Sequence, residues 1–163
     1  MRIDGRAIAS QVRAELAGRI AALRERRGVT PTLAIVVATD DESTAFYVRS
    51  LVRTAQRLGI EARTVEVSRT AAREEIRETL ATASADPAVH GVICQTPLPG
   101  DLRLEDVGDA IAPDVDVDGA NPTSLGRLAA GLPGAFLPAT AAAVMKILEA
   151  EGIALLGRRA VVI

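Results

Sequence analysis

The sequence predicts an α/β fold, a three-layer sandwich built around a mainly parallel sheet. Strand and helix patterns alternate three times up to residue 95, which is typical of a parallel sheet with helices on both faces. The run at 33–38 is apolar without interruption, as expected of a strand buried on both faces. Ligands of such sheets bind beyond the carboxyl ends of the strands, so we expect a site there.

The first helix is predicted at 5–27, because its apolar side chains recur at spacings of three and four with Arg and Glu between them. It should end near Gly28. A second helix is predicted at 43–58, where Gly59 ends it, and the next strand at 62–67.

A third, Ala-rich helix is predicted at 70–85, started by a Ser/Thr cap, with a short strand at 91–95 after it. The alternating Asp and Val of 114–118 favour a further extended segment. The remaining expected elements are a short helix at 123–130, a Gly/Pro turn at 131–134, a long Ala-rich helix at 138–151 and an apolar strand at 157–163.

The composition limits the classes of partner. Nineteen basic and twenty-one acidic residues leave a net charge of −2, and there are three aromatic residues, so we expect no binding of nucleic acid. No apolar run approaches the roughly 20 residues that span a bilayer, and we expect no membrane anchor. The single cysteine, Cys94, and single histidine, His90, argue against a disulfide, a zinc site or a Ser-His-Asp triad, and they favour a cytoplasmic setting.

The acidic stretch at 114–122 has two functional interpretations. A calcium loop needs acids at its first, third and fifth positions, Gly at the sixth and Glu at the twelfth, but the twelfth position here is Leu125. We therefore expect no metal. A strand end that leads into Gly-Ala-Asn-Pro is instead suited to hold a carboxylate at the mouth of a pocket. A solvated acidic loop remains the alternative on this stretch alone.

Three separated segments carry a resemblance to a known family. They are Thr-Ala-Phe-Tyr-Val-Arg-Ser at 44–50, Gly-Val-Ile-Cys-Gln-Thr-Pro-Leu-Pro at 91–99, and Asp-Val-Asp-Gly at 116–119 with Gly-Arg-Leu at 126–128. In this order and at these separations they resemble the bifunctional methylenetetrahydrofolate dehydrogenase/cyclohydrolase family. The resemblance covers essentially the whole chain.

The resemblance implies a domain plan and an activity. Residues 1–137 would form the folate-binding catalytic domain, 138–156 a connecting helix, and 157–163 the first strand of a truncated, Rossmann-type nicotinamide-cofactor domain. Members oxidise 5,10-methylenetetrahydrofolate with NADP and hydrolyse the methenyl product to 10-formyltetrahydrofolate. The family resemblance also implies a homodimer at full length. No G-x-G-x-x-G element occurs in the sequence, so NADP, or NAD as the alternative, would bind to the missing domain.

The site residues follow from the resemblance and from their chemistry. A carboxylate can accept two adjacent N–H groups of a reduced pterin, for which Asp118 is the first candidate and Asp116 the second. Tyr47 would stack on the flat ligand, and Gln95 would offer an acceptor and a donor to the one-carbon bridge. Catalytic roles are expected for Gln95, Tyr47 and Asp118, and further substrate contacts for Pro97, Leu98, Gly119, Pro138 and Thr140.

Two departures from the family pattern affect the chemistry. The family places a lysine one helical turn after the tyrosine, where it transfers protons in the hydrolytic step, and this position is Leu51. Helical spacing turns Arg49 and Arg53 away from it. We therefore expect weak cyclohydrolase activity. The alternative is a catalytically silent folate-binding or regulatory paralogue. A remoter alternative is the substrate domain of another dehydrogenase. The segment 138–143 also lacks the usual Pro-Cys-Thr-Pro-x-Gly sequence of the ligand cleft.

Overall fold

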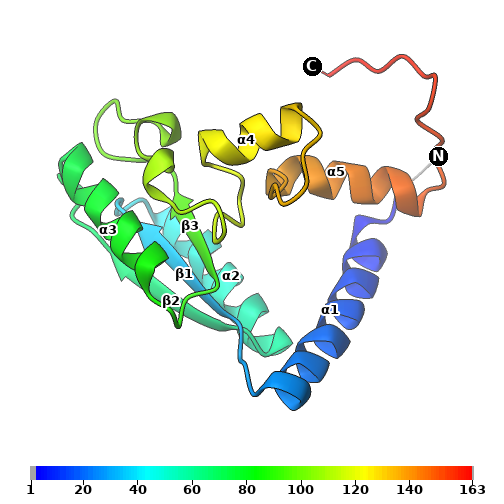
Figure 1. The fold of residues 1–163 in the computed structure, drawn as a ribbon, viewed down its shortest axis with the longest axis horizontal. Coiled ribbons are helices and arrows are strands. Elements are labelled where there is room, and N and C mark those ends of the chain that lie inside the picture. Colours follow the sequence, from blue (N-terminus) through cyan, green and yellow to red (C-terminus); the bar gives the residue numbers. More distant parts are fainter. Residues whose placement is uncertain (1–2, 163) are drawn as a thin grey trace.

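The computed structural model describes residues 3–162 and confirms the predicted α/β class. In chain order the first elements are α1 (Gly5–Arg27), β1 (Thr32–Val37), α2 (Glu42–Leu58) and β2 (Glu61–Glu66). They are followed by α3 (Arg73–Ala85) and β3 (Gly91–Gln95), and later by α4 (Pro122–Ala129) and α5 (Ala139–Ala150). Figure 1 shows α1 and α5 beside the sheet rather than on it.

The sheet has three parallel strands in the order β2-β1-β3. β1 lies in the centre, and Val37 at its carboxyl end is in register with Glu66 of β2 and Gln95 of β3. The carboxyl ends of all three strands therefore meet at one edge of the sheet. Only residues 38–41 separate the end of β1 from the start of α2, and this places the start of that helix near the same ends of the strands.

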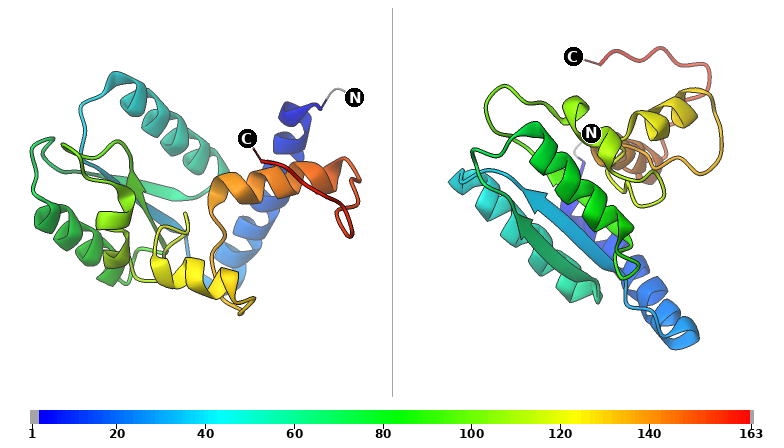
Figure 2. Two further views of the ribbon diagram at one scale, coloured as in Figure 1. Left: turned by 90° about the horizontal axis from the view of Figure 1, so that it is seen from above. Right: turned by 60° about the vertical axis from the view of Figure 1, so that its left-hand side comes forward.

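The two faces of the sheet are covered by different helices, which produces the three layers (Figure 2). Ile35 and Val37 of β1 pack against Val48 and Leu51 of α2. The opposite face of the sheet packs against α3 in a larger core. That core includes Ala34, Val36, Val92, Cys94, Ile76, Leu80 and Leu98. Alternate residues of one strand face opposite sides, which explains why the whole β1 run is apolar.

Local capping interactions set the helix ends. Asp41 caps α2, where its Oδ2 accepts from the N–H of Thr44 (2.7 Å), and Gly59 ends that helix with a positive φ of 83°. The third helix begins at Arg73, with Ala72 at the cap and no side-chain hydrogen bond there. The Ser/Thr cap predicted for this helix was therefore wrong. Ser68 and Thr70 instead bond to each other in the preceding turn (2.9 Å).

The connection from β3 to α4 is irregular. Two short 3-10 turns, at Leu104–Asp106 and Gly108–Ala110, are followed by a single parallel bridge between Val92 and Asp116. Turns flank this bridge on both sides, so the extended segment predicted at 114–118 was wrong apart from that one residue. Asp116 explains the difference, because its carboxylate bonds to backbone groups further along the loop.

The last third of the described chain exposes most of its large apolar side chains. They include Leu125, Leu128, Leu132, Leu137, Val144, Met145, Ile153, Leu155, Leu156, Val161 and Val162. Residues 157–162 form no strand, and Ile163 of the predicted strand lies outside the described residues. α5 contacts α1, and beyond this contact much of its surface is exposed. Among residues 3–162, no helix is both long and apolar enough to cross a membrane.

Candidate functional site

Gln95 occupies the carboxyl end of β3 on the face that α2 covers. Its register partner is Val37, and paired residues of neighbouring strands point to the same face. Val37 packs against α2, so the half-buried Gln95 side chain belongs to that face as well. Its Nε2 donates to the carbonyl oxygen of Thr96 (2.9 Å), which orients the amide at the strand end. Pro97 follows, exposed, after a cis Thr96-Pro97 peptide bond.

Tyr47 and Leu51 lie one turn apart on α2, near the same edge of the sheet. Tyr47 is 53% exposed, which leaves its ring available to a flat ligand. Leu51 is half-buried against the cluster of Ile35, Val37 and Val48. An aliphatic side chain therefore stands where the resemblance implies a lysine.

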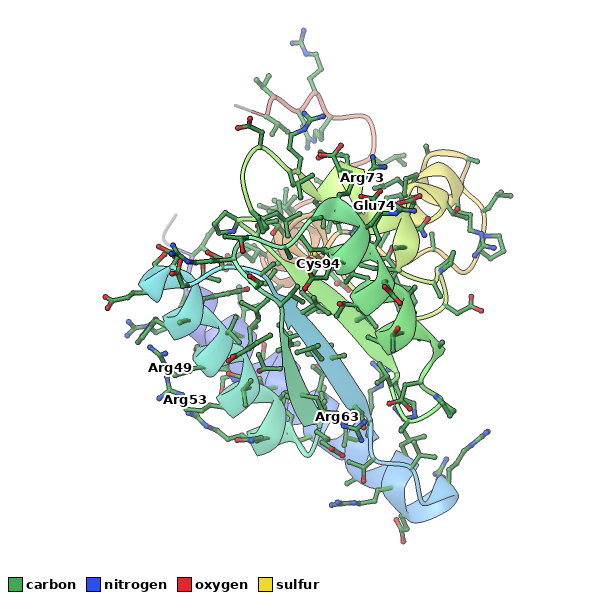
Figure 3. The ribbon with its side chains drawn as sticks, turned by 90° about the vertical axis from the view of Figure 1, so that its left-hand side faces the viewer. Arg49, Arg53, Arg63, Arg73, Glu74 and Cys94 are labelled. Carbon is green, nitrogen blue, oxygen red and sulfur yellow. The ribbon has the colours of Figure 1, made fainter. Side chains whose placement is uncertain are left out.

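Arg49 and Arg53 lie on the part of the α2 surface that is next to β2. Figure 3 shows both guanidinium groups projecting outward from α2. Arg49 and Arg53 line a hollow together with Thr64 of β2. β2 and β3 are the two outer strands of the sheet, with β1 between them. Neither arginine is thus placed near the end of β3, where it could take over the role of the family lysine.

Asp118 is half-buried on the loop that leads from the bridge at Asp116 to α4. Burial raises the pKa of its carboxyl group, and the nearby negative charge of Asp116 raises this pKa further. A hydrogen bond from the backbone of Ala139, the first residue of α5, acts in the opposite direction. Asp118 is therefore a carboxylate that is partly withdrawn from water and held at the amino end of a helix, where its negative charge is favoured.

Gly119 brings this loop into close contact with the start of α5. Its φ is 70°, and a Cβ at this position would lie 2.9 Å from the backbone nitrogen of Pro138. Only glycine fits both the conformation and the space. Pro138 is half-buried, and Thr140 is exposed on the first turn of α5. The structure thus brings together four of the predicted residues: Asp118, Gly119, Pro138 and Thr140.

Two predicted binding residues are enclosed instead. Asp116 is 0% exposed, and its two oxygens accept from the N–H groups of Ala120 (2.8 Å) and Asn121 (2.9 Å). Leu98 packs into the core beneath α3. We assign both side chains to structural roles. The role of Asn121 as the cap of α4 was not predicted from the sequence. An Asn before a Pro is nevertheless a common signal for the start of a helix.

The remaining reactive side chains lie elsewhere. Cys94 faces the α3 side of the sheet, and burial raises the pKa of its thiol to about 11 (Figure 3). His90 is exposed at the amino ends of the strands, where its Nδ1 accepts from the N–H of Thr32 (3.2 Å). Across residues 3–162, no group of three or more His, Cys, Asp or Glu side chains is arranged to hold a metal ion.

Comparison with known proteins places these features in a family. Residues 3–118 match the family described as "Tetrahydrofolate dehydrogenase/cyclohydrolase, catalytic domain". The chain is 53% identical over 161 residues to Bifunctional protein FolD 1 of Saccharopolyspora erythraea, covering 99% of this chain and 54% of that protein. It is 48% identical over 161 residues to Bifunctional protein FolD 1 of Rhodococcus jostii, covering 99% and 54%.

Solved structures show the same fold. The bifunctional FolD methylenetetrahydrofolate dehydrogenase/cyclohydrolase of Campylobacter jejuni superposes with a TM-score of 0.87 at 30% identity, covering 92% of this chain and 53% of that one. The Trypanosoma brucei enzyme, solved with NADP and an inhibitor, gives 0.88 at 28% identity, covering 97% and 54%. The chain spans about half the length of the relatives it matches. It belongs to the tetrahydrofolate dehydrogenase/cyclohydrolase family.

Proposed function

We propose that this chain binds a reduced folate at the carboxyl ends of β1 and β3. The placement of Asp118 carries the proposal: it is a half-buried carboxylate, fixed between a glycine turn and the start of α5. A pterin offers two adjacent N–H donors, which one carboxylate can accept together. Tyr47 would stack on the ligand from α2, and Gln95 would face its one-carbon bridge from β3. Pro97, Gly119, Pro138 and Thr140 would border the ligand.

We propose that the reaction belongs to a longer protein, in which this chain would supply the folate site. We infer that this protein oxidises 5,10-methylenetetrahydrofolate to the methenyl compound, with NADP as hydride acceptor. The residues of this chain do not fit the cofactor, because the sequence has no glycine-rich phosphate loop. What this chain contributes is orientation of the folate, since holding two reactants in the correct geometry lowers the barrier to their reaction.

The exposed apolar surface supports a second domain. Leu137, Met145, Ile153 and Leu155 line a hollow beside α5, and further apolar side chains lie exposed on both sides of it. Large exposed apolar patches generally mark contact surfaces. The relatives are about twice as long as this chain, which is consistent with a further domain covering this surface. Residues 157–163 would then form its first strand once neighbouring strands are present.

Hydrolysis of the methenyl compound is proposed to be weak. This step needs positioned proton transfer, which commonly contributes about 10²–10⁴-fold, and Leu51 has no proton to transfer. The same residue favours a second candidate, a folate-binding paralogue without catalysis. Turnover of methylenetetrahydrofolate by the longer protein distinguishes the two, because the paralogue would bind the folate and leave it unchanged.

Calorimetric titration with tetrahydrofolate tests the binding proposal on the chain itself. Asp118→Ala should weaken binding by about 2–5 kcal/mol, the loss expected when a buried charged hydrogen bond loses one partner. Asp114→Ala is the matched control, since Asp114 is an exposed acid on the same stretch and should leave the affinity unchanged. Equal affinity of the Asp118→Ala variant and the unmodified chain would remove Asp118 from the site.

A further inference from the structure

Asp116 is the one charged side chain among the fully buried residues of 3–162. A carboxylate in this position is costly unless its oxygens are satisfied. Oδ1 accepts from the N–H of Ala120 at 2.8 Å and Oδ2 from the N–H of Asn121 at 2.9 Å. Bonds of this kind to an ionised group are stronger than bonds between neutral groups. The carboxylate therefore closes the loop 116–121 on itself.

Asn121 extends this closure to the rest of the fold. It is the cap of α4, where its Oδ1 accepts from the N–H of Thr123 at 2.6 Å, and its Nδ2 donates to the carbonyl oxygen of Ile111 at 2.7 Å. The buried carboxylate thus faces the amino end of α4, which carries partial positive charge. One side of the loop is tied to α4, and the other is tied to β3 through the bridge with Val92.

Asp118 lies between these two fixed points. The N–H of Gly119 donates to the carbonyl oxygen of Asp116 at 3.2 Å, which makes a tight turn with Asp118 inside it. The Asp116 side chain in turn holds Ala120 and Asn121, the two residues that follow this turn. The backbone that carries the Asp118 side chain is therefore held by a residue that is itself shielded from solvent.

We propose that Asp116 is a positioning residue, whose buried carboxylate closes the loop 116–121 and so holds the Asp118 carboxylate ready to accept the two N–H groups of the pterin. This inference rests on the proposed function and adds to it a residue that acts without touching the ligand. A binding group held in place by a supporting shell loses less entropy when the ligand arrives.

Asp116→Asn is the direct test, because it keeps the shape of the side chain and replaces one acceptor oxygen with an NH₂ group. One backbone N–H then loses its acceptor. The affinity for tetrahydrofolate should fall on the order of tenfold, as expected when a buried donor is left unpaired. Removal of the charge should also lower the pKa of Asp118, followed by carbon-13 NMR of its carboxyl group, because Asp116 now raises that pKa.

Asp109→Asn is the matched control. Asp109 precedes the loop and pairs with Arg77 at the exposed surface. The variant removes one negative charge from the same connection and leaves the hydrogen bonds of Asp116 intact. It should change neither the affinity for tetrahydrofolate nor the pKa of Asp118.

The outcomes separate the two proposals. A folded Asp116→Asn variant with the affinity of the unmodified chain would overturn the positioning role, whatever its melting temperature. The Asp118 site would still stand if Asp118→Ala weakens binding as expected. Normal binding by Asp118→Ala would overturn both. If Asp116→Asn does not fold, the variant Asn121→Ser tests the positioning role instead. Serine still caps α4, but the hydrogen bond to the carbonyl oxygen of Ile111 is lost. It should bind tetrahydrofolate several-fold more weakly, and unchanged affinity would overturn the proposal.

Discussion

Leu51 is the side chain on which the proposed difference between hydride transfer and hydrolysis depends. It packs against Ile35, Val37 and Val48, and it lies one helical turn from Tyr47, near the strand end that holds Gln95. In the proposed function, orientation of the folate depends on groups that are present in this chain. Proton transfer depends on a titratable group, which Leu51 cannot supply. Binding and hydride transfer are therefore expected to survive better than hydrolysis.

Replacing Leu51 with lysine should raise the rate of methenyltetrahydrofolate hydrolysis in the longer protein. The apolar surroundings would lower the pKa of the new ammonium group toward neutrality, where it can act as a base. A stopped assay, corrected for the spontaneous rate, measures the effect. Leu58→Lys, at the far end of α2, is the control and should leave the rate unchanged. Brisk hydrolysis by the unmodified protein would mean that another group transfers the proton.

Cys94 should resist alkylation in the folded chain. Its thiol has a pKa of about 11 because it is buried, so the thiolate that reacts is scarce at neutral pH, and the side chain is 4% exposed. Iodoacetamide at pH 7.5 should label the native chain slowly and the urea-unfolded chain rapidly, with the mass of the adduct as the readout. Equal labelling rates in the two states would contradict the buried placement.

At the level of elements, the sequence predicted the regular structure well and the loops poorly. The helix at Gly5–Arg27 and the strand at Gly91–Gln95 have the predicted bounds, and the second helix begins one residue before the predicted start, at Glu42. These elements depend on apolar periodicity, which is visible along the chain. The stretch 114–118 depends instead on bonds between the Asp116 carboxylate and residues four and five positions later. An alternating pattern of Asp and Val does not reveal such bonds.

The same limit applies to the site. Motif resemblance selected Asp118, Gly119, Pro138 and Thr140, which the structure brings together, but it could not separate them from the enclosed Asp116 and Leu98. Both acids belong to one short motif, and burial distinguishes them. Burial follows from tertiary packing, which a motif of a few residues does not contain.

Gly119→Ala should destabilise the chain more than Gly100→Ala. Both glycines have positive φ, 70° and 58°, so both variants share the cost of that conformation, about 1–2 kcal/mol. A Cβ at Gly119 would also meet the backbone of Pro138, whereas nothing lies within 4 Å of one at Gly100. Overpacking adds about 1–3 kcal/mol. Urea unfolding measures the difference, and equal midpoints would argue against the tight contact between this loop and α5.

At the scale of the whole molecule, the chain has two dissimilar parts. The sheet with α2 and α3 encloses its apolar side chains in two clusters, whereas residues 125–162 leave many of theirs exposed. Val161 and Val162 are 86% and 97% exposed. We interpret the first part as a complete core and the second as a surface that a further domain would cover.

The 163-residue chain should therefore bind tetrahydrofolate without binding NADP. Calorimetric titration of one preparation with each compound tests this, and the folate titration shows that the preparation is competent. A longer protein that continues beyond Ile163 with a second domain should bind both compounds and oxidise methylenetetrahydrofolate. Saturable binding of NADP by the 163-residue chain would place a cofactor site where the sequence has no phosphate loop.

β2 forms one edge of the three-stranded sheet, and its outer side has a bearing on solubility. Edge strands expose backbone groups that can recruit strands of other molecules, and charged side chains oppose this. Glu61, Arg63 and Glu66 lie on β2, and Arg63 pairs with Glu61 and with Asp86 after α3. Every copy of the chain presents the same charged side chains along this edge, so pairing of one β2 with another is opposed at this side of the sheet.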